Sequence, residues 1–135
     1  MIYLDTSVIV SYMDESDSNH AKSISLLNKI RDKKVASELT IVELSSVYSR
    51  AGLENPLALS LYSVKKVGAN VIDVDFNQVL MYASKLSQQL KLRTLDLLHI
   101  TTAKIVEANQ FATFDKDIIA KSRFISQQGI EVIGG

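Results

Sequence analysis

The sequence predicts a three-layer α/β/α fold, in which helices cover both faces of a central parallel sheet. Short apolar runs alternate along the chain with longer segments whose apolar residues recur at helical spacing. This alternation is typical of βαβ units, whose strands run parallel. The chain has one proline and no Gly/Ser-rich linker or internal repeat, so we expect one domain spanning residues 1–135.

The N-terminal half is predicted to contain two strands and four helices. A polar break at 14–19 separates the first helix from a second, which carries Ile24, Leu27 and Ile30 at helical spacing. Pro56 is placed where a helix can begin, since the first turn tolerates a missing N–H. The predicted elements are a strand at Ile2–Leu4, helices at Ser7–Met13 and His20–Lys33, a strand at Val35–Ala36, and helices at Thr40–Arg50 and from Pro56 onward.

The C-terminal half is predicted to repeat the alternation of strand and helix. Asp75 is a good N-cap, because its side chain can accept a hydrogen bond from a free amide of the first turn. The helix that starts at Thr94 is apolar on most sides, which indicates burial. The predicted elements are a strand at Val71–Val74, helices from Asp75 to Leu90 and at Thr94–Glu107, a strand at Phe111–Thr113, a helix at Asp117–Gln127 and a strand at Ile130–Ile133.

The composition excludes several kinds of site. The chain has no cysteine, which excludes disulfides, thiolate zinc sites, iron–sulfur clusters and cysteine nucleophiles. Only His20 and His99 could supply imidazole, so a bound metal would be held mainly by oxygen, which favours Mg²⁺ or Mn²⁺.

Charge and hydropathy indicate where the protein acts. The 15 basic and 15 acidic residues balance, so the net charge indicates neither nucleic acid nor an anionic membrane as a partner. No uncharged stretch approaches the roughly 20 residues of a membrane span, and the N-terminus lacks the pattern of a signal peptide. We therefore expect a soluble cytoplasmic protein with no membrane partner.

Four acidic residues stand at corresponding places in the predicted βα units. Asp5 ends the first strand and Asp115 follows a late one, while Glu43 and Asp96 lie in the first turns of helices. Sites in parallel sheets lie beyond the carboxyl ends of the strands, so these carboxylates can meet at one edge. Their mutual repulsion would be relieved by a cation such as Mg²⁺, which can activate water and neutralise charge on a phosphoryl group.

Each acid also has a purely structural alternative. Glu43 could close a capping box with Thr40. Asp5 could be a helix N-cap, and Asp115 or Asp117 could cap the last helix. Asp96 could simply complement a helix dipole, although its neighbours look buried and a lone buried carboxylate is costly. It is the coincidence of the four acids that favours a site.

Two further sets of residues lie close to the predicted site in sequence. His99 follows Asp96 by three residues and can share its helix face. We expect it to be a buried, hydrogen-bonded histidine rather than a direct participant. Lys91, Arg93 and Lys116 could guide the phosphates of a nucleic acid, with strongly salt-dependent binding.

Four segments, in this order along the chain, are similar to the sequence motifs of PIN-domain ribonucleases. The order and spacing match over essentially the whole chain, and the size resembles that of stand-alone PIN domains such as the VapC toxins of VapBC toxin–antitoxin pairs. The matching segments are Leu4–Ile9, Leu39–Glu43, Leu95–Ala103 and Ala112–Asp117.

The resemblance implies an α/β/α PIN fold and Mg²⁺- or Mn²⁺-dependent endoribonuclease activity. By position it assigns the catalytic and metal-binding roles to Asp5, Glu43, Asp96 and Asp115. Asp117 could share or take over the role of Asp115, and Ile118 stands where the family has an aromatic residue. The resemblance further implies an RNA substrate, a small antitoxin protein as partner, and a homodimer.

Other readings of the acidic residues fit less well. A haloacid-dehalogenase-type phosphatase needs a second acid where this chain has Ser7, and a response-regulator receiver needs an acidic pair by the first strand. Neither a Walker-A loop nor a GxGxxG run is present. The remaining alternative is an inactive PIN fold that serves as an RNA- or protein-binding module, against which the four intact acids argue.

Overall fold

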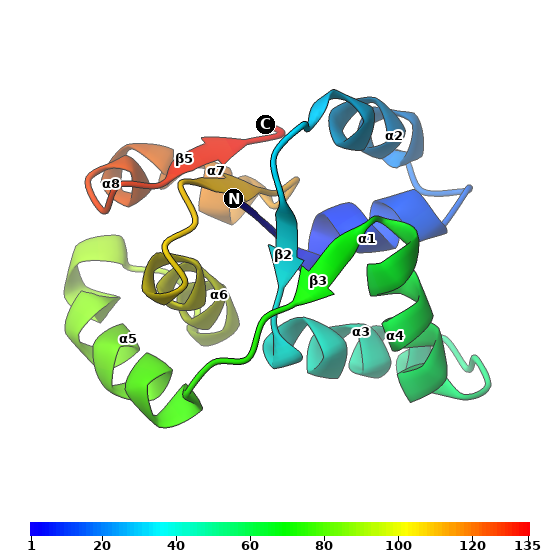
Figure 1. The fold of residues 1–135 in the computed structure, drawn as a ribbon, viewed down its shortest axis with the longest axis horizontal. Helices are drawn as coiled ribbons and strands as arrows, with labels where there is room; N and C mark the ends of the chain where they lie inside the picture. Colours follow the sequence, from blue (N-terminus) through cyan, green and yellow to red (C-terminus); the bar gives the residue numbers. More distant parts are fainter.

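The computed structural model describes residues 1–135, which form a five-stranded, all-parallel sheet between two layers of helices (Figure 1). The strands lie in the order β3-β2-β1-β4-β5, so β1 is central. The predicted fold class is confirmed. The strands are β1 (Ile2–Leu4), β2 (Lys34–Ala36), β3 (Ala69–Val71), β4 (Gln110–Ala112) and β5 (Glu131–Ile133).

Helices cover the two faces of the sheet in two groups. The first four helices lie on one side and α5, α6 and α8 lie on the other, as Figure 1 shows. None of these helices has the length and hydrophobicity needed to cross a membrane. The helices are α1 (Thr6–Met13), α2 (His20–Lys29), α3 (Glu38–Arg50), α4 (Pro56–Lys66), α5 (Phe76–Leu90), α6 (Thr94–Ile105), α7 (Lys116–Ile119) and α8 (Ser122–Ser126).

The core consists of one apolar cluster on each face of the sheet. Side chains alternate along a strand, so Tyr3 of β1 points into the cluster beneath α5 and α6, whereas Ile2 and Leu4 point into the other. All three residues are buried, which explains why β1 is an unbroken apolar run. Asp5, which directly follows β1, is thus held at the end of the central, buried strand of the sheet.

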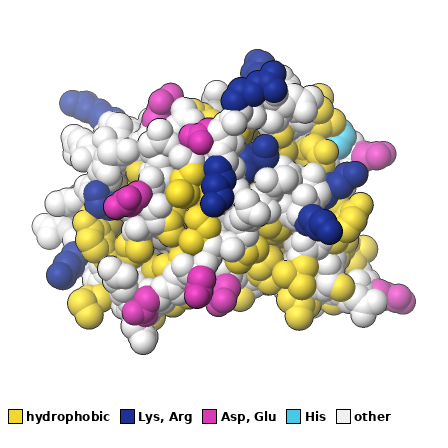
Figure 2. Space-filling model, viewed as in Figure 1, with side chains coloured by type: hydrophobic (Ala, Val, Ile, Leu, Met, Phe, Trp, Pro, Cys, Tyr) yellow, Lys and Arg dark blue, Asp and Glu magenta, His cyan; other side chains and the backbone are white.

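The surface agrees with the balanced composition. On the face shown in Figure 2, basic and acidic side chains are interspersed with exposed apolar ones, and no large region of one sign is present. Binding of a polyanion would therefore depend on a local arrangement of charges rather than on the net charge.

Several predicted elements have other ends in the structure; the second helix, for example, ends at Lys29 rather than at Lys33. Two elements differ more. The third strand is Ala69–Val71 rather than Val71–Val74, because Gly68, at φ 78°, ends α4 and the ladder with β2 already pairs Ala36 with Val71. The predicted helix Asp117–Gln127 is divided into α7 and α8. Between them, the Lys121 amide donates to the Ile118 carbonyl at 2.9 Å, a tight turn that separates the two short helices.

Candidate active site

The four predicted acids lie together in one cleft at the carboxyl edge of the sheet. The cleft has a volume of about 350 Å³, and its walls include Asp5, Glu43, Asp96 and Asp115. They come from four elements: the end of β1, α3, α6 and the start of α7. Asp17, which sequence reasoning did not select, also lines the cleft, whereas Asp117 lines a neighbouring depression.

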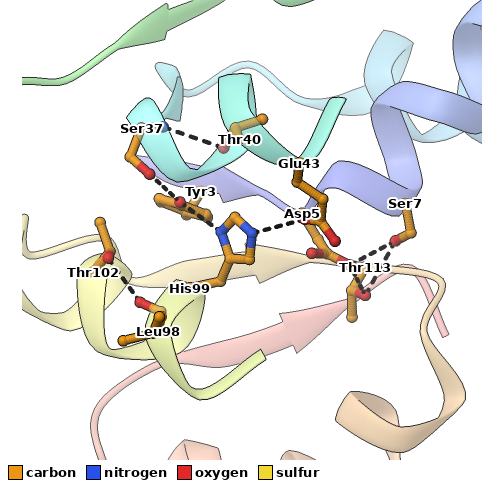
Figure 3. A network of polar contacts seen from close by, with 10 residues as sticks. All are labelled: Tyr3, Asp5, Ser7, Ser37, Thr40, Glu43, Leu98, His99, Thr102 and Thr113. Carbon is orange, nitrogen blue, oxygen red and sulfur yellow. Dashed lines mark hydrogen bonds and ion pairs between the residues drawn. The ribbon is translucent and has the colours of Figure 1, made fainter. Parts of the chain in front are cut away.

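Asp5 is held by hydroxyl groups. It occupies the N-cap position of α1, as the structural alternative expected, but its side chain makes no capping hydrogen bond. Its Oδ2 accepts hydrogen bonds from Ser7 Oγ and Thr113 Oγ1, both at 2.7 Å (Figure 3). Burial raises the pKa of Asp5, while nearby His99 and the two hydroxyls act in the opposite direction.

Glu43 does not close a capping box with Thr40. The capping box of α3 joins Ser37 to Thr40, whose Oγ1 accepts from the Ser37 amide at 3.3 Å, so the helix begins two residues before the predicted Thr40. Glu43 is thereby free to accept a hydrogen bond from His99 Nε2 at 2.9 Å. Partial burial is the largest single influence and would raise the pKa of Glu43, but the bond from His99, together with smaller contributions such as the charge of Arg50, lowers it.

Asp96 lies in the first turn of α6, and its carboxylate accepts no hydrogen bond from the protein. Its pKa is raised to about 6, chiefly by burial and further by the negative charges of Asp115, Asp5 and Glu43. Asp96 therefore marks the point at which the negative charge of the cleft is least compensated.

Asp115 combines a structural position with a place in the cleft. It is the N-cap of α7, and its Oδ1 accepts from the Asp117 amide at 2.9 Å. The capping alternative is therefore confirmed for Asp115. This capping hydrogen bond uses only Oδ1, so the second carboxylate oxygen of Asp115 remains available for a ligand in the cleft.

His99 is fully buried and hydrogen-bonded through both ring nitrogens, as expected. Its Nδ1 lies 2.8 Å from the Tyr3 hydroxyl, which in turn lies 2.7 Å from Ser37 Oγ (Figure 3). Sequence reasoning missed Tyr3 and Ser37, as well as Thr113. Their only signal is a polar atom next to a predicted strand, and that signal acquires meaning only once the strand order is known.

The donor set fits a hard divalent cation. Oxygen ligands suit Mg²⁺ and Mn²⁺, and ligand atoms of Asp5, Glu43 and His99 lie within 4.8 Å of one another. Asp96, whose carboxylate accepts no hydrogen bond from the protein, lines the same cleft. An uncompensated carboxylate of this kind is a feature that a cation would satisfy.

Residues 2–123 match the family model of the PIN domain. The chain therefore belongs to the PIN-domain family, as its motifs indicated. No curated protein matches it in a comparison of sequences.

Solved structures with similar folds are toxins and toxin–antitoxin complexes. The Mycobacterium tuberculosis toxin VapC20, described as cleaving the sarcin–ricin loop, is 15% identical with a TM-score of 0.72, over 89% of this chain and 94% of that chain. A Klebsiella pneumoniae toxin–antitoxin complex gives 18% identity and a TM-score of 0.70, over 100% and 98% of the two chains. VapBC-1 from nontypeable Haemophilus influenzae is 21% identical with a TM-score of 0.63, over 98% of this chain and 97% of that chain. At these identities the likeness concerns the fold.

Proposed function

We propose that this protein is a metal-dependent endoribonuclease that hydrolyses RNA phosphodiester bonds in the cytoplasm, as the toxin of a VapBC-type toxin–antitoxin pair. The observation that carries the proposal is the convergence of four carboxylates from separate elements on one cleft of a PIN-domain fold. A scaffold used only for binding would have no reason to gather these charges, since their repulsion destabilises the fold.

Asp5, Glu43, Asp96 and Asp115 would hold Mg²⁺ or Mn²⁺. When bound, such an ion lowers the pKa of coordinated water and neutralises charge on a phosphoryl group. Ser7 and Thr113 orient Asp5, and His99 orients Glu43, so these two carboxylates are in place before any ligand arrives. We place the fourth acidic role at Asp115 rather than Asp117, because Asp115 lines the cleft.

A basic depression next to the cleft supports RNA as the substrate. It has a volume of about 290 Å³, and Lys91, Arg93 and Lys121 line it together with Asp117. None of the three cations forms an ion pair within the protein. Asp117 follows Asp115 by two residues and Arg93 precedes Asp96 by three, so the depression and the acidic cleft are lined by the same two segments of the sequence. Unpaired cations in this place suit the phosphates of an RNA strand that continues beyond the cleft.

An apolar depression on the other side supports a protein partner. It has a volume of about 270 Å³, seven of its eight lining residues are hydrophobic, and it shares Val10 and Val47 with the acidic cleft. A small antitoxin could fill it with apolar side chains and place a basic side chain among the carboxylates. The similar structure titled a toxin–antitoxin complex supports this partner, and family resemblance suggests a homodimer.

The function can be tested by incubating the purified protein with a mixed RNA substrate in Mg²⁺, in Mn²⁺ and in EDTA. We expect endonucleolytic cleavage with at least one ion, none in EDTA, and none by the Asp96→Asn variant. Absence of cleavage with both ions would contradict a nuclease. RNA binding without cleavage would instead favour the inactive binding module. Co-purification of a small protein from the native host would test the antitoxin.

A further inference from the structure

A chain of three hydrogen bonds runs through the interior of the protein to the acidic cleft. It leads from Ser37 Oγ to the Tyr3 hydroxyl (2.7 Å), on to His99 Nδ1 (2.8 Å), and from His99 Nε2 to Glu43 Oε1 (2.9 Å), as Figure 3 shows. Ser37, Tyr3 and His99 have no solvent exposure, whereas the Glu43 side chain is 27% exposed. The chain therefore connects a sealed interior to one carboxylate of the site.

The same three hydrogen bonds link the elements that carry the acids. Ser37 is the N-cap of α3, and Glu43 lies further along the same helix. Between them the hydrogen bonds pass through Tyr3 on β1, which leads into Asp5, and His99 on α6, which carries Asp96. The elements that carry three of the four acids are thus joined by one set of buried hydrogen bonds.

An account of the polar hydrogens gives the chain a direction. The Glu43 carboxylate can only accept, so His99 Nε2 must carry a proton. If Nδ1 carries none, it accepts from Tyr3, the Tyr3 oxygen accepts from Ser37, and every hydroxyl hydrogen has an acceptor.

We propose that His99 is a positioning residue, which is held by Tyr3 and Ser37, fixes one oxygen of Glu43 through the proton on Nε2 and is not itself a metal ligand. The role in positioning rests on the proposed function, because it concerns an acid of the proposed ion site. Direct ligation by Nε2 would need the lone pair that this proton occupies. Hydrogen bonds of this kind to a ligating carboxylate orient it, and their loss typically weakens metal binding about 10- to 100-fold.

The other histidine provides an internal reference. His20 Nδ1 lies 2.9 Å from the Ser11 carbonyl oxygen, which can only accept, so Nδ1 carries the proton there. The two histidines of the chain should thus display opposite tautomers when neutral.

The protonated ring nitrogens can be read from long-range ¹H–¹⁵N correlation spectra of ion-free protein labelled at histidine, recorded at about pH 8. Comparison with the His20→Asn variant assigns the two rings. We expect His99 to carry a proton on Nε2 and His20 to carry one on Nδ1. A His99 ring without a proton on Nε2 would overturn the proposal.

Two substitutions of His99 separate positioning from packing. Glutamine can place an amide N–H near the position of Nε2 and reach Glu43, whereas asparagine can reach only the position of Nδ1. We expect His99→Asn to weaken Mn²⁺ binding, measured by water proton relaxation, about 10-fold or more, and His99→Gln to stay within about 3-fold of the wild type. Equal Mn²⁺ affinity of the wild type and a folded His99→Asn variant would contradict the positioning role.

Tyr3→Phe provides a variant that keeps the core filled. The aromatic ring stacks on Phe111 with centroids 5.5 Å apart, and this contact does not need the hydroxyl. We expect the variant to fold, to keep the Nε2 proton that Glu43 requires, and to shift the ¹⁵N signal of Nδ1, which loses its hydrogen-bond partner. An unchanged Nδ1 signal would overturn the role of Tyr3. If the wild type binds Mn²⁺ yet cleaves no RNA, the proposed function fails while the spectra and the affinities still decide the role of His99.

Discussion

The carboxylates of the acidic cleft form two pairs, which differ in the hydrogen bonds that they accept from the protein. Asp5 and Glu43, which we name the inner pair, accept hydrogen bonds from the side chains of Ser7, Thr113 and His99. Asp96 and Asp115, the outer pair, receive little support: Asp96 accepts no bond from the protein, and Asp115 accepts one from a backbone amide of its own helix. The inner pair is positioned by the fold, whereas the outer pair contributes charge that the protein leaves for a ligand to neutralise.

Because of this difference, removal of an inner and of an outer carboxylate should have different effects on the stability of the fold, although both should impair activity. Removing an inner carboxylate disrupts buried hydrogen bonds and should destabilise the fold. Removing an outer carboxylate relieves repulsion and should not. Both changes should impair an ion site equally, so the two pairs can be distinguished only when stability and activity are measured on the same variants.

The largest expected effect is on RNA cleavage by Asp96→Asn and Asp5→Asn. Each variant should lose cleavage by about 100-fold or more, because each removes a proposed ion ligand. In EDTA, Asp96→Asn should unfold at an equal or higher urea concentration than the wild type. Asp5→Asn should lose about 1 to 2 kcal/mol in free energy of unfolding, because an amide cannot accept from both Ser7 and Thr113 on one oxygen while leaving its N–H₂ satisfied. Two stability changes of the same sign would contradict the distinction between the pairs.

A smaller effect should separate Asp115 from Asp117. Asparagine is as good an N-cap as aspartate, so Asp115→Asn should keep its bond to the Asp117 amide and the stability of α7. We expect cleavage to fall at least about 10-fold in Asp115→Asn and less than about 3-fold in Asp117→Asn, which lies outside the cleft. If Asp117→Asn is the more damaging variant in single-turnover cleavage assays, the fourth acid has been placed wrongly.

Addition of Mg²⁺ should raise the melting temperature of the wild type. A ligand that binds only the folded state at about ten times its Kd contributes about 1.4 kcal/mol, or roughly 3 to 6 °C for a chain of this size. Asp96→Asn should shift by less than half as much, while sodium chloride of equal ionic strength serves as the control. An equal shift in both proteins would show that the ion binds elsewhere.

The smallest expected effect is on the pH dependence of stability. Because the pKa of Asp96 is about 6 in the fold and ordinary in the unfolded chain, the folded state binds the proton more tightly. Its contribution is therefore present at low pH and lost as pH rises from about 4 through about 6. In EDTA, urea denaturation of the wild type should lose about 1 kcal/mol relative to Asp96→Asn over this range, after allowance for solvent screening. A difference that grows in the opposite direction would contradict the raised pKa.

The sequence was sufficient to predict the fold class and the grouping of the acids. Apolar runs such as Ile2–Leu4 locate the buried strands, and parallel strands bring residues after their ends to one edge. The partners of the acids could not be predicted in the same way. Thr113 meets Asp5 across 108 residues because β1 pairs with β4, and local spacing contains no information about that pairing.

Local signals also misassigned hydrogen bonds where two candidates compete. Thr40 and Glu43 have the spacing of a capping box, but Ser37 takes the N-cap position and pairs with Thr40 instead. Asp115 and Asp117 are both acids at the start of α7, and only the three-dimensional arrangement separates the one in the cleft from the one outside it.

The central position of β1 sets the order in which the protein can assemble during translation. β1 is made first, but β4, its neighbour on one side, is separated from it by the whole of α1 to α6. Until β4 has been made, one edge of β1 is unpaired and Asp5 lacks the Thr113 hydroxyl. Parallel pairing across so long a connection is slow, because the loop must close before the contacts form. A chain interrupted before Gln110 should therefore expose a strongly apolar strand edge, and self-association rather than catalysis is its expected fate.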